Sequence, residues 1–214
     1  MWLIPTRNRP DGIVKLIACM KACGEVPDAA VMIDGNEGGY DGVKWPENWH
    51  IHHATEHLEF IAGLNALAKF HPDDWYGVLP DHSRPASKNW SSRLVSACVG
   101  GWSNAVNGGK INPSNGRQKM VEGVIDAKLV YVAGWVFADW LTHFYGDDLW
   151  EEVLQDVGLW HQTDVVIGCD KIRNHPRIHK GVRYHDDDKR KWKAWRAGGG
   201  VKAMIDKLRG AGLC

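Results

Sequence analysis

The sequence lacks several features that mark membrane, secreted or disulfide-rich proteins. Its longest apolar run, residues 129–138, stops at Asp139, short of the roughly 18 residues that a membrane span requires. The five cysteines are odd in number and form no Cys-x-x-Cys pair, which argues against a disulfide scaffold and a zinc knuckle. The chain opens with neither a basic leader nor a long apolar stretch. We therefore expect a cytoplasmic protein without a membrane span.

The net charge is zero, but the acidic and basic residues are unevenly distributed along the chain. Lysine plus arginine and aspartate plus glutamate each number 26 among 214 residues. Residues 1–170 hold 13 basic and 22 acidic side chains, a balance of −9, whereas residues 171–214 hold 13 and 4, a balance of +9. Either the basic tail neutralises the acidic body within the molecule, or the tail binds a polyanion.

Tryptophan, in contrast, is abundant, with 12 residues. Each indole offers a wide flat face and one N–H donor, which suits an aromatic core or a surface that stacks on rings. With 44% hydrophobic and 24% charged residues, the chain has the composition of a globular protein that buries a real core.

The first 80 residues alternate between strand and helix patterns. Apolar runs predict strands at residues 2–5, 29–33, 50–55 and 75–79, and helical periodicity predicts helices at 11–23 and 56–70. This order predicts an α/β domain with a mainly parallel central sheet flanked by helices. Ligands of such sheets bind beyond the carboxyl ends of the strands. Those ends carry polar side chains here: Thr6, Arg7, Arg9, Asp34 and Asp81.

The second half of the chain is less regular. It predicts a helix at 87–99, a Gly- and Asn-rich loop at 100–117, and a buried helix or a mixture of helix and strand at 128–145. A helix at 147–157 opens on two acidic residues, and a last short strand follows at 165–168.

Each polar feature at the strand ends has a functional and an ordinary interpretation. Asp81, followed by His82 and Ser83, can hold Mg²⁺ or Mn²⁺ against a diphosphate, although Pro-Asp-x-Ser is also common turn chemistry. The planar forks of Arg7 and Arg9 can bind phosphate or a base edge, or simply be solvated. Asp34 can accept from a base or a ribose hydroxyl, or can form an Asp-Gly turn.

Two features of the second half are similarly ambiguous. Asp147 and Asp148 favour a helix dipole at a helix start, and a carboxylate there can also act as a general base. His175, in a loop after the last strand, can complete a metal site begun by Asp81 or can be polar surface. A zinc site among the histidines at 50–57 is disfavoured, because no acidic or Cys ligand follows at a recognisable spacing.

The order of these pieces resembles the nucleotide-sugar glycosyltransferases of the GT-A fold, in the broad family-2-like group and its small phage-type members. The opening Pro-Thr-Arg-Asn-Arg-Pro at 5–10 looks like the first nucleotide-binding loop of that family. Val-Met-Ile-Asp-Gly-Asn at 31–36 looks like its second strand with the acidic residue. Residues 58–68 and 75–85 are similar to the helix and strand that lead into the metal-binding DxD motif.

The later motifs extend the resemblance to roughly residues 2–185. Residues 145–160 look like the segment that holds the catalytic base of inverting members, and His175 with the following proline is similar to the late metal-binding histidine. One departure is that the DxD position has Asp81 as its single acidic residue. The resemblance implies one GT-A-like domain at 1–185, with a nucleotide-binding half at 1–85 and an acceptor half at 86–185. A basic, Trp-containing segment, 186–214, follows.

The resemblance implies an enzyme that moves a hexosyl or pentosyl group from a nucleoside diphosphate sugar, such as a UDP sugar, to an acceptor hydroxyl. It assigns donor binding to Pro5, Thr6, Arg7, Arg9, Asp34 and Asp81. It assigns a Mn²⁺ or Mg²⁺ ion to Asp81, Ser83 and His175. Proton removal from the acceptor falls to Asp148, or to Asp147.

The tail bears on the acceptor. Basic residues interleaved with Trp192 and Trp195 are typical of nucleic-acid binding, which would fit a hydroxymethylated base in phage DNA as acceptor. Candidate acceptor-binding residues are then Trp135, Trp140, Lys189, Arg190 and Trp192. The other interpretation of the tail is an amphipathic helix that neutralises the acidic body.

Two rival functions are weaker on these residues. A nucleotidyltransferase on a similar sheet would normally bring a Gly-rich phosphate loop near the first strand, and residues 5–12 contain Gly12 alone. A non-catalytic nucleic-acid-binding module would leave the placement of Asp34, Asp81 and Asp148 unexplained.

Overall fold

Strands β1 (Trp2–Thr6) and β2 (Ala29–Ile33) are apolar runs that pair in parallel and are buried almost throughout. The computed structural model describes residues 1–35, 39–106, 122–170 and 178–214. In β1, Leu3 faces one hydrophobic cluster, whereas Trp2 and Ile4 face another. Runs of this kind are typical of parallel strands that are covered by helices on both faces.

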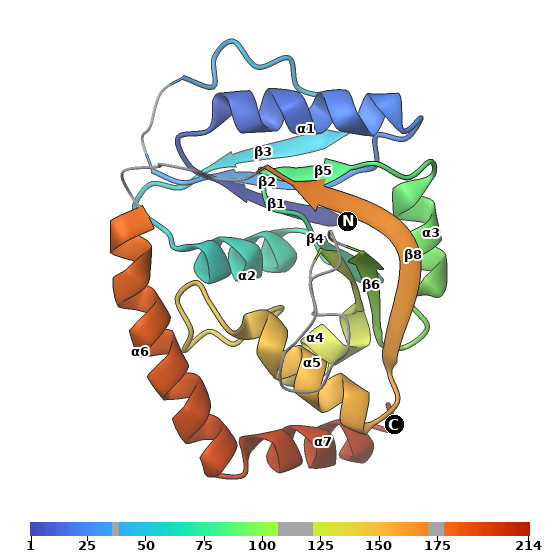
Figure 1. Ribbon diagram of the computed structural model, residues 1–214, viewed down its shortest axis with the longest axis vertical. Helices are drawn as coiled ribbons and strands as arrows, with labels where there is room; N and C mark the ends of the chain where they lie inside the picture. The colour runs from blue at the N-terminus through green and yellow to red at the C-terminus, as the bar shows by residue number, and fades with distance from the viewer. Residues whose placement is uncertain (36–38, 107–121, 171–177) are drawn as a thin grey trace.

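The described strands form one curved sheet in the order β3-β2-β1-β4-β7-β6-β8-β5 (Figure 1). On one side, β3 (Trp49–His53), β2, β1 and β4 (Trp75–Val78) all run parallel. The other side consists of β7 (Gly123–Asp126), β6 (Trp102–Val106), β8 (Trp160–Cys169) and β5 (Ser83–Pro85). There β6 and β8 are parallel, whereas β7 and β5 run antiparallel to their neighbours. The predicted α/β fold with a mainly parallel sheet is confirmed.

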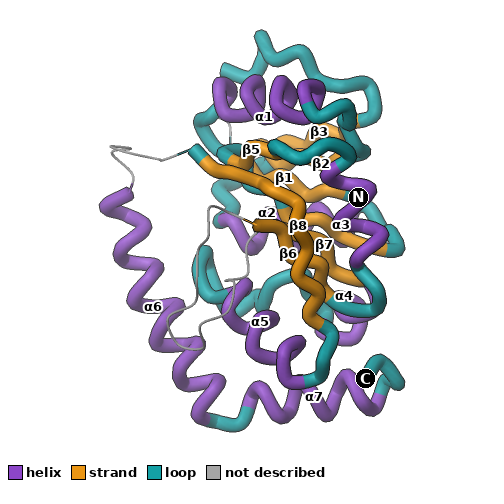
Figure 2. The backbone as a smooth tube through the Cα atoms, turned by 45° about the vertical axis from the view of Figure 1, so that its right-hand side comes forward, coloured by secondary structure: helices purple, strands orange, loops and turns teal. Residues whose placement is uncertain are grey.

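Helices cover both faces of the sheet, as Figure 2 shows from the side. One cluster packs beneath α1 (Pro10–Ala22) and α3 (Trp90–Ala97). The other packs beneath α2 (Phe60–Phe70), α4 (Ala127–Ala133) and α5 (Gly146–Asp156). The C-terminal helix α7 (Gly200–Gly210) lies against α4 and α5 and buries Met204 and Leu208 in this second cluster.

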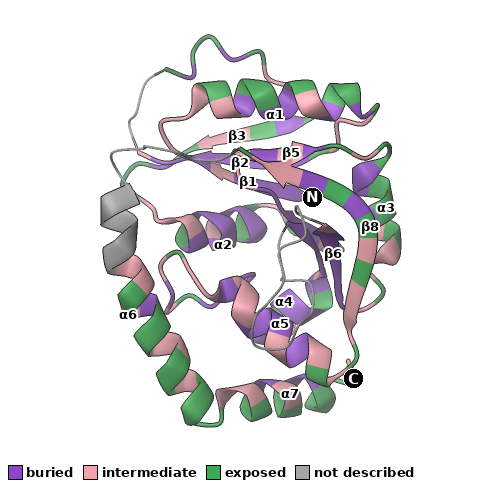
Figure 3. Cartoon of the chain, in the orientation of Figure 1, coloured by how far each residue is buried: buried purple, intermediate pink, exposed green. Residues whose placement is uncertain are grey.

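Helix α6 (Ile178–Ala197) runs along the outside of the molecule. The boundary expected after residue 185, between the domain and the basic segment, falls within this helix. Figure 3 shows exposed residues along much of its length. Trp192 and Trp195 nevertheless lie half-buried against the cluster under α4 and α5. Among the described helices, none combines the length and the apolar character that crossing a membrane requires.

The prediction of a loop at 100–117 is wrong for its first part, because β6 is a buried strand at the middle of the second half of the sheet. The run looks polar in the sequence because it contains Ser103 and Asn104, but both residues are fully buried. Ser103 Oγ donates to the Leu94 carbonyl (2.7 Å), and Asn104 Nδ2 donates to Gln162 Oε1 (2.9 Å). These bonds offset the cost of burying polar groups. The rest of that loop, 107–117, lies outside the described residues.

One further strand was not predicted, and two element boundaries differ from the prediction. Strand β7 lies just before the region 128–145, which was expected to be a buried helix or a mixture of helix and strand, and β8 is ten residues long rather than the four at 165–168. Helix α2 begins at Phe60, not at residue 56. The late start has a tertiary cause: the Leu58 N–H and the His57 ring bind the Asp34 carboxylate at the end of β2, so residues 56–59 form a loop.

Candidate active site

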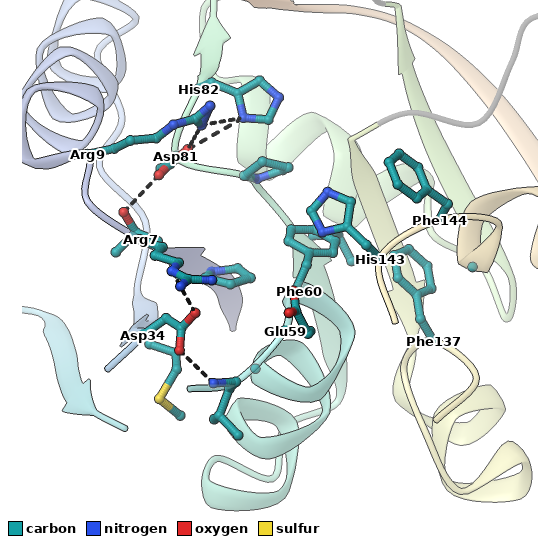
Figure 4. A pocket seen from close by; sticks show the side chains of 18 of the residues that line it. Arg7, Arg9, Asp34, Glu59, Phe60, Asp81, His82, Phe137, His143 and Phe144 are labelled. Carbon is teal, nitrogen blue, oxygen red and sulfur yellow. Dashed lines mark hydrogen bonds and ion pairs between the residues drawn. The ribbon is translucent and has the colours of Figure 1, made fainter. Parts of the chain in front are cut away.

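A cavity of about 700 Å³ opens at the carboxyl ends of β1, β2 and β4. Its walls come from the loops after these strands, from the start of α2, and from the segment that leads into α5. Figure 4 shows charged side chains on one side of it and aromatic side chains on the other. The cavity brings together the six residues that the resemblance assigns to the donor and one member of the acidic pair: Pro5, Thr6, Arg7, Arg9, Asp34, Asp81 and Asp147.

Asp81 lies at the centre of the charged side. Its Oδ2 accepts a hydrogen bond from the Thr6 hydroxyl (2.8 Å), and its Oδ1 pairs with the Arg9 guanidinium and lies 3.5 Å from His82 Nδ1. Burial alone would raise the pKa of Asp81. The hydrogen bond with His82, the charge of Arg9 and the Thr6 bond outweigh it and lower that pKa. Asp81 is therefore a carboxylate at neutral pH, and it holds Arg9 in place.

The loop that carries the two arginines is fixed by a chain of hydrogen bonds. The Arg9 backbone N–H donates to the Tyr40 hydroxyl (3.0 Å), which lies 2.8 Å from Thr6 Oγ1. Asn8, between the arginines, adopts the left-handed conformation (φ 53°), which Asn tolerates better than most residues. The turn thus presents both guanidinium groups to the cavity.

A second polar network surrounds Asp34 after β2. Asp34 Oδ1 accepts from the Leu58 N–H (2.6 Å), and Oδ2 lies 2.7 Å from His57 Nδ1 and 3.5 Å from Arg7 Nε. His57 Nε2 lies 2.8 Å from Glu59 Oε1. His57 and Glu59 were not predicted at the site. Sequence reasoning placed His57 in a disfavoured zinc cluster, and the turn that returns it to β2 has no sequence signal of its own.

The opposite wall is aromatic and was also not predicted. Phe60, Phe137, His143 and Phe144 line it. The His143 ring is 5.3 Å from Phe60 and meets Phe144 edge to face at 4.7 Å. Desolvation is the largest cause that lowers the pKa of His143, and it outweighs the opposing effects of Glu59 and Asp188. The imidazole is therefore neutral at pH 7.

The acidic pair opens α5, and the two carboxylates differ in position. Asp147 lines the cavity, whereas Asp148 is not among the described residues that do so. Tyr145 precedes the helix in the left-handed conformation (φ 67°). A Cβ on Gly146 would lie 2.6 Å from the Phe137 ring, so only glycine allows the start of α5 to approach the aromatic wall this closely.

The predicted metal ligands are not brought together among the described residues. Ser83 is fully buried, and its hydroxyl donates to Glu122 Oε1 (2.8 Å), a residue that lines the cavity. His175 lies outside the described residues. Asp81 is engaged by Arg9 and Thr6. Within the described part of the chain, no group of three His, Cys, Asp or Glu is placed to hold a metal ion.

None of the five predicted acceptor residues, all of which the structure describes, lines the cavity: Trp135, Trp140, Lys189, Arg190 and Trp192. Their indoles pack on other aromatic rings. Trp135 contacts Trp150 at 5.3 Å, and Trp192 stacks on Tyr145 at 5.5 Å. Lys189 and Arg190 are exposed on α6, where Arg190 pairs with Asp187.

The fold is that of the GT-A class of nucleotide-sugar glycosyltransferases. The structure is similar to glucosyl-3-phosphoglycerate synthase from Mycobacterium tuberculosis, solved with Mn²⁺, UDP and glucosyl-3-phosphoglycerate. The TM-score is 0.63 with 12% identity over 86% of this chain and 75% of that chain. It is also similar to mannosyl-3-phosphoglycerate synthase from Rubrobacter xylanophilus (TM-score 0.61, 14% identity, 92% of this chain, 74% of that chain).

A third similar structure is S. aureus TarS, with a TM-score of 0.58 and 11% identity over 78% of this chain and 36% of that chain. No protein-family model and no curated protein sequence matches the chain. At such identities the likeness establishes the fold, and it confirms the GT-A fold expected from the order of the motifs.

Proposed function

We propose that the protein is a glycosyltransferase that moves a sugar from a nucleoside diphosphate sugar to an acceptor hydroxyl. The observation that carries the proposal is the cavity at the strand ends, which Arg7, Arg9 and Asp34 line together with Asp147. The GT-A fold supports it, because similar structures were solved with UDP or with UDP-glucose and Mn²⁺.

The charged side of the cavity suits the donor. The Asp34 carboxylate can accept hydrogen bonds from a ribose or a base, as acidic residues after a second strand do in nucleotide-binding sheets. Arg7 and Arg9 reach the same space and can bind a diphosphate by their planar forks. Because Asp81 holds Arg9 in place, this cation needs little reorganisation when negative charge develops on the leaving group.

The chemical step follows from these placements. The acceptor oxygen attacks the anomeric carbon, and the bond from that carbon to the diphosphate oxygen breaks. The nucleoside diphosphate leaves with the electron pair, and Arg7 and Arg9 neutralise its charge. Asp147 takes the proton of the acceptor hydroxyl, because it is the member of the acidic pair that lines the cavity. Metal binding by Asp81, Ser83 and His175 remains a prediction, and no step here depends on it.

Binding of the donor tests the proposal most directly. A panel of nucleoside diphosphate sugars is screened by thermal shift, with and without Mn²⁺, because a ligand of the folded state must raise its melting temperature. We expect at least one UDP or other nucleoside diphosphate sugar to do so, and Arg7→Ala and Asp34→Ala to abolish the shift. If none raises the melting temperature under either condition, the proposal is wrong.

The nucleotidyltransferase alternative gains nothing from the glycine near β1. A Cβ on Gly12 would lie 3.1 Å from the backbone oxygen of Asp81, so this glycine allows α1 to pack closely on the turn after β4. A packing role accounts for it without a phosphate loop.

The acceptor is a separate question. The hypothesis that the acceptor is a hydroxymethylated base in DNA depends on the basic side of α6, where Lys189 and Arg190 are exposed. Within that segment, Arg190 and Lys191 pair with Asp187, and Arg196 pairs with Glu152. These pairs favour neutralisation within the chain over binding of a polyanion.

A further inference from the structure

Asp188 differs sharply from the two aspartates that precede it. The side chain of Asp186 is 78% exposed and that of Asp187 is 36% exposed, whereas Asp188 is fully buried. Asp188 Oδ1 accepts from the Thr142 N–H (2.9 Å). Its Oδ2 accepts from the N–H groups of His143 (2.8 Å) and Phe144 (2.9 Å). One carboxylate thus binds three successive backbone amides.

These amides belong to the aromatic wall of the cavity. His143 and Phe144 line it with their side chains, and the chain then passes through Tyr145 into the first turn of α5 with Asp147. Hydrogen bonds from backbone amides to a carboxylate are charge-assisted and among the stronger bonds in proteins. Because Asp188 is fully buried, these bonds fix the path of the chain, and hence the direction of the side chains that it carries.

The neighbours of Asp188 on α6 contact the same segment. His185, one turn earlier, has its Nε2 3.0 Å from the Tyr145 hydroxyl and meets the Phe144 ring edge to face at 5.3 Å. Trp192, one turn later, stacks on Tyr145. Positions 185, 188 and 192 share one helix face. That face of α6 therefore follows the chain from the cavity wall to the start of α5.

We propose that Asp188 is a positioning residue for the transfer reaction: it fixes the backbone of residues 142–144 and thereby holds the aromatic wall and Asp147 in place for the acceptor. This inference rests on the glycosyltransferase function proposed above. Asp188 does not line the cavity and touches neither substrate in this scheme. Its effect is transmitted through the three amides.

The attachment of α6 does not depend on Asp188 alone. Trp195 packs against Trp140 at 5.9 Å, Arg196 pairs with Glu152, and α7 continues the chain beneath α4 and α5. Removal of the carboxylate should therefore loosen residues 142–146 while the helix stays docked. Arg7 and Asp34 lie on the opposite side of the cavity, so the donor side should be unaffected.

The test compares Asp188→Ala and Asp188→Asn with the matched control Asp186→Asn, which removes an exposed charge from the same helix. Three measurements are made on the full-length protein: the Kd for the nucleoside diphosphate of the donor that is active in the panel, the kcat and KM for its release from that donor, and hydrogen exchange of residues 140–148. We expect the Kd to stay within about twofold and turnover by Asp188→Ala to fall on the order of 10²-fold, as displacement of reacting groups does. Exchange should rise at 142–146 and stay unchanged in β1 and α7.

Asp188→Asn keeps one acceptor oxygen and should lose less turnover than Asp188→Ala, and it replaces Asp188→Ala if that variant does not fold. Two results would overturn the inference: exchange at 142–146 and turnover equal to those of Asp186→Asn, or a loss of affinity for that nucleoside diphosphate as large as the loss of turnover. Failure of the glycosyltransferase proposal is distinguishable, because the wild type would then release no nucleoside diphosphate from any donor of the panel, while hydrogen exchange still reports whether Asp188 holds the wall.

Discussion

Substitution of the two aspartates at the start of α5, one at a time, tests the proposed base with a control built into the chain. Asp147 and Asp148 both lie in the first turn of the helix. Replacing either with Asn removes one favourable interaction with the helix dipole, at a cost of about 0.3–1 kcal/mol in stability. The melting temperature of each variant separates this effect on stability from what the Asp147 carboxylate does inside the cavity.

The expected difference is large. Asp147 lines the cavity, so Asp147→Asn should leave the Kd for UDP nearly unchanged and lower turnover by about 10²-fold or more, the usual contribution of a general base. This corresponds to a rise in the activation free energy of about 2.7 kcal/mol or more. Asp148→Asn should retain turnover within about threefold of the wild type. UDP release under saturating donor measures kcat, and titration calorimetry measures the Kd.

Two outcomes would refute this reasoning. If Asp148→Asn loses the turnover instead, the cavity position of Asp147 does not identify the base. If neither variant loses more than about tenfold, another group takes the proton. His143→Gln would then be the next variant, because the neutral imidazole of His143 lines the same wall.

Three further expectations concern stability. The folded-state pKa of Asp81 is below its ordinary value of 3.8, so the stability that its carboxylate contributes is present above pH 3.8 and is lost as the pH falls through the folded-state pKa. The unfolding free energy of Asp81→Asn should therefore depend less on pH in the acid range than that of the wild type, as measured by circular dichroism. Gly146→Ala should overpack against Phe137 and cost about 1–3 kcal/mol in urea unfolding, whereas Gly210→Ala, with open space around it, should not destabilise. Trp192→Ala should lower the free energy of unfolding by about 2 kcal/mol, less than the same substitution of a fully buried Trp would. It should leave oligonucleotide affinity at low salt unchanged; a selective loss of that affinity would instead favour a nucleic-acid acceptor.

The donor side of the site could be predicted from the sequence because its residues follow apolar strand runs. Thr6, Asp34 and Asp81 come directly after or at the end of such runs, and the carboxyl ends of parallel strands meet at one edge of a sheet. The topology alone then brings these side chains together. Local pattern and one general rule were sufficient.

The aromatic side could not be predicted, because tertiary packing rather than a strand end places it. Phe60 comes from a helix start whose position depends on the Asp34 network, and His143 and Phe144 come from a segment held by α6. Asp188 belongs to a run of three aspartates that looks solvated in the sequence. Its burial follows from the 185, 188, 192 spacing on one helix face, a pattern that the surrounding charges obscure.

The uneven charge of the chain has a structural reason in this arrangement. The basic tail returns to the most acidic helix, α5, where Arg196 pairs with Glu152, and Lys207 donates to the Ala133 carbonyl at the end of α4. Exposed pairs of this kind contribute little stability, at most about 1 kcal/mol each. Docking is driven instead by apolar burial, for which the fully buried Leu208 is the clearest case. Packing of α7 on α4 and α5, together with the pairing of Arg196 with the acidic α5, places α6 so that Asp188 reaches the wall of the cavity.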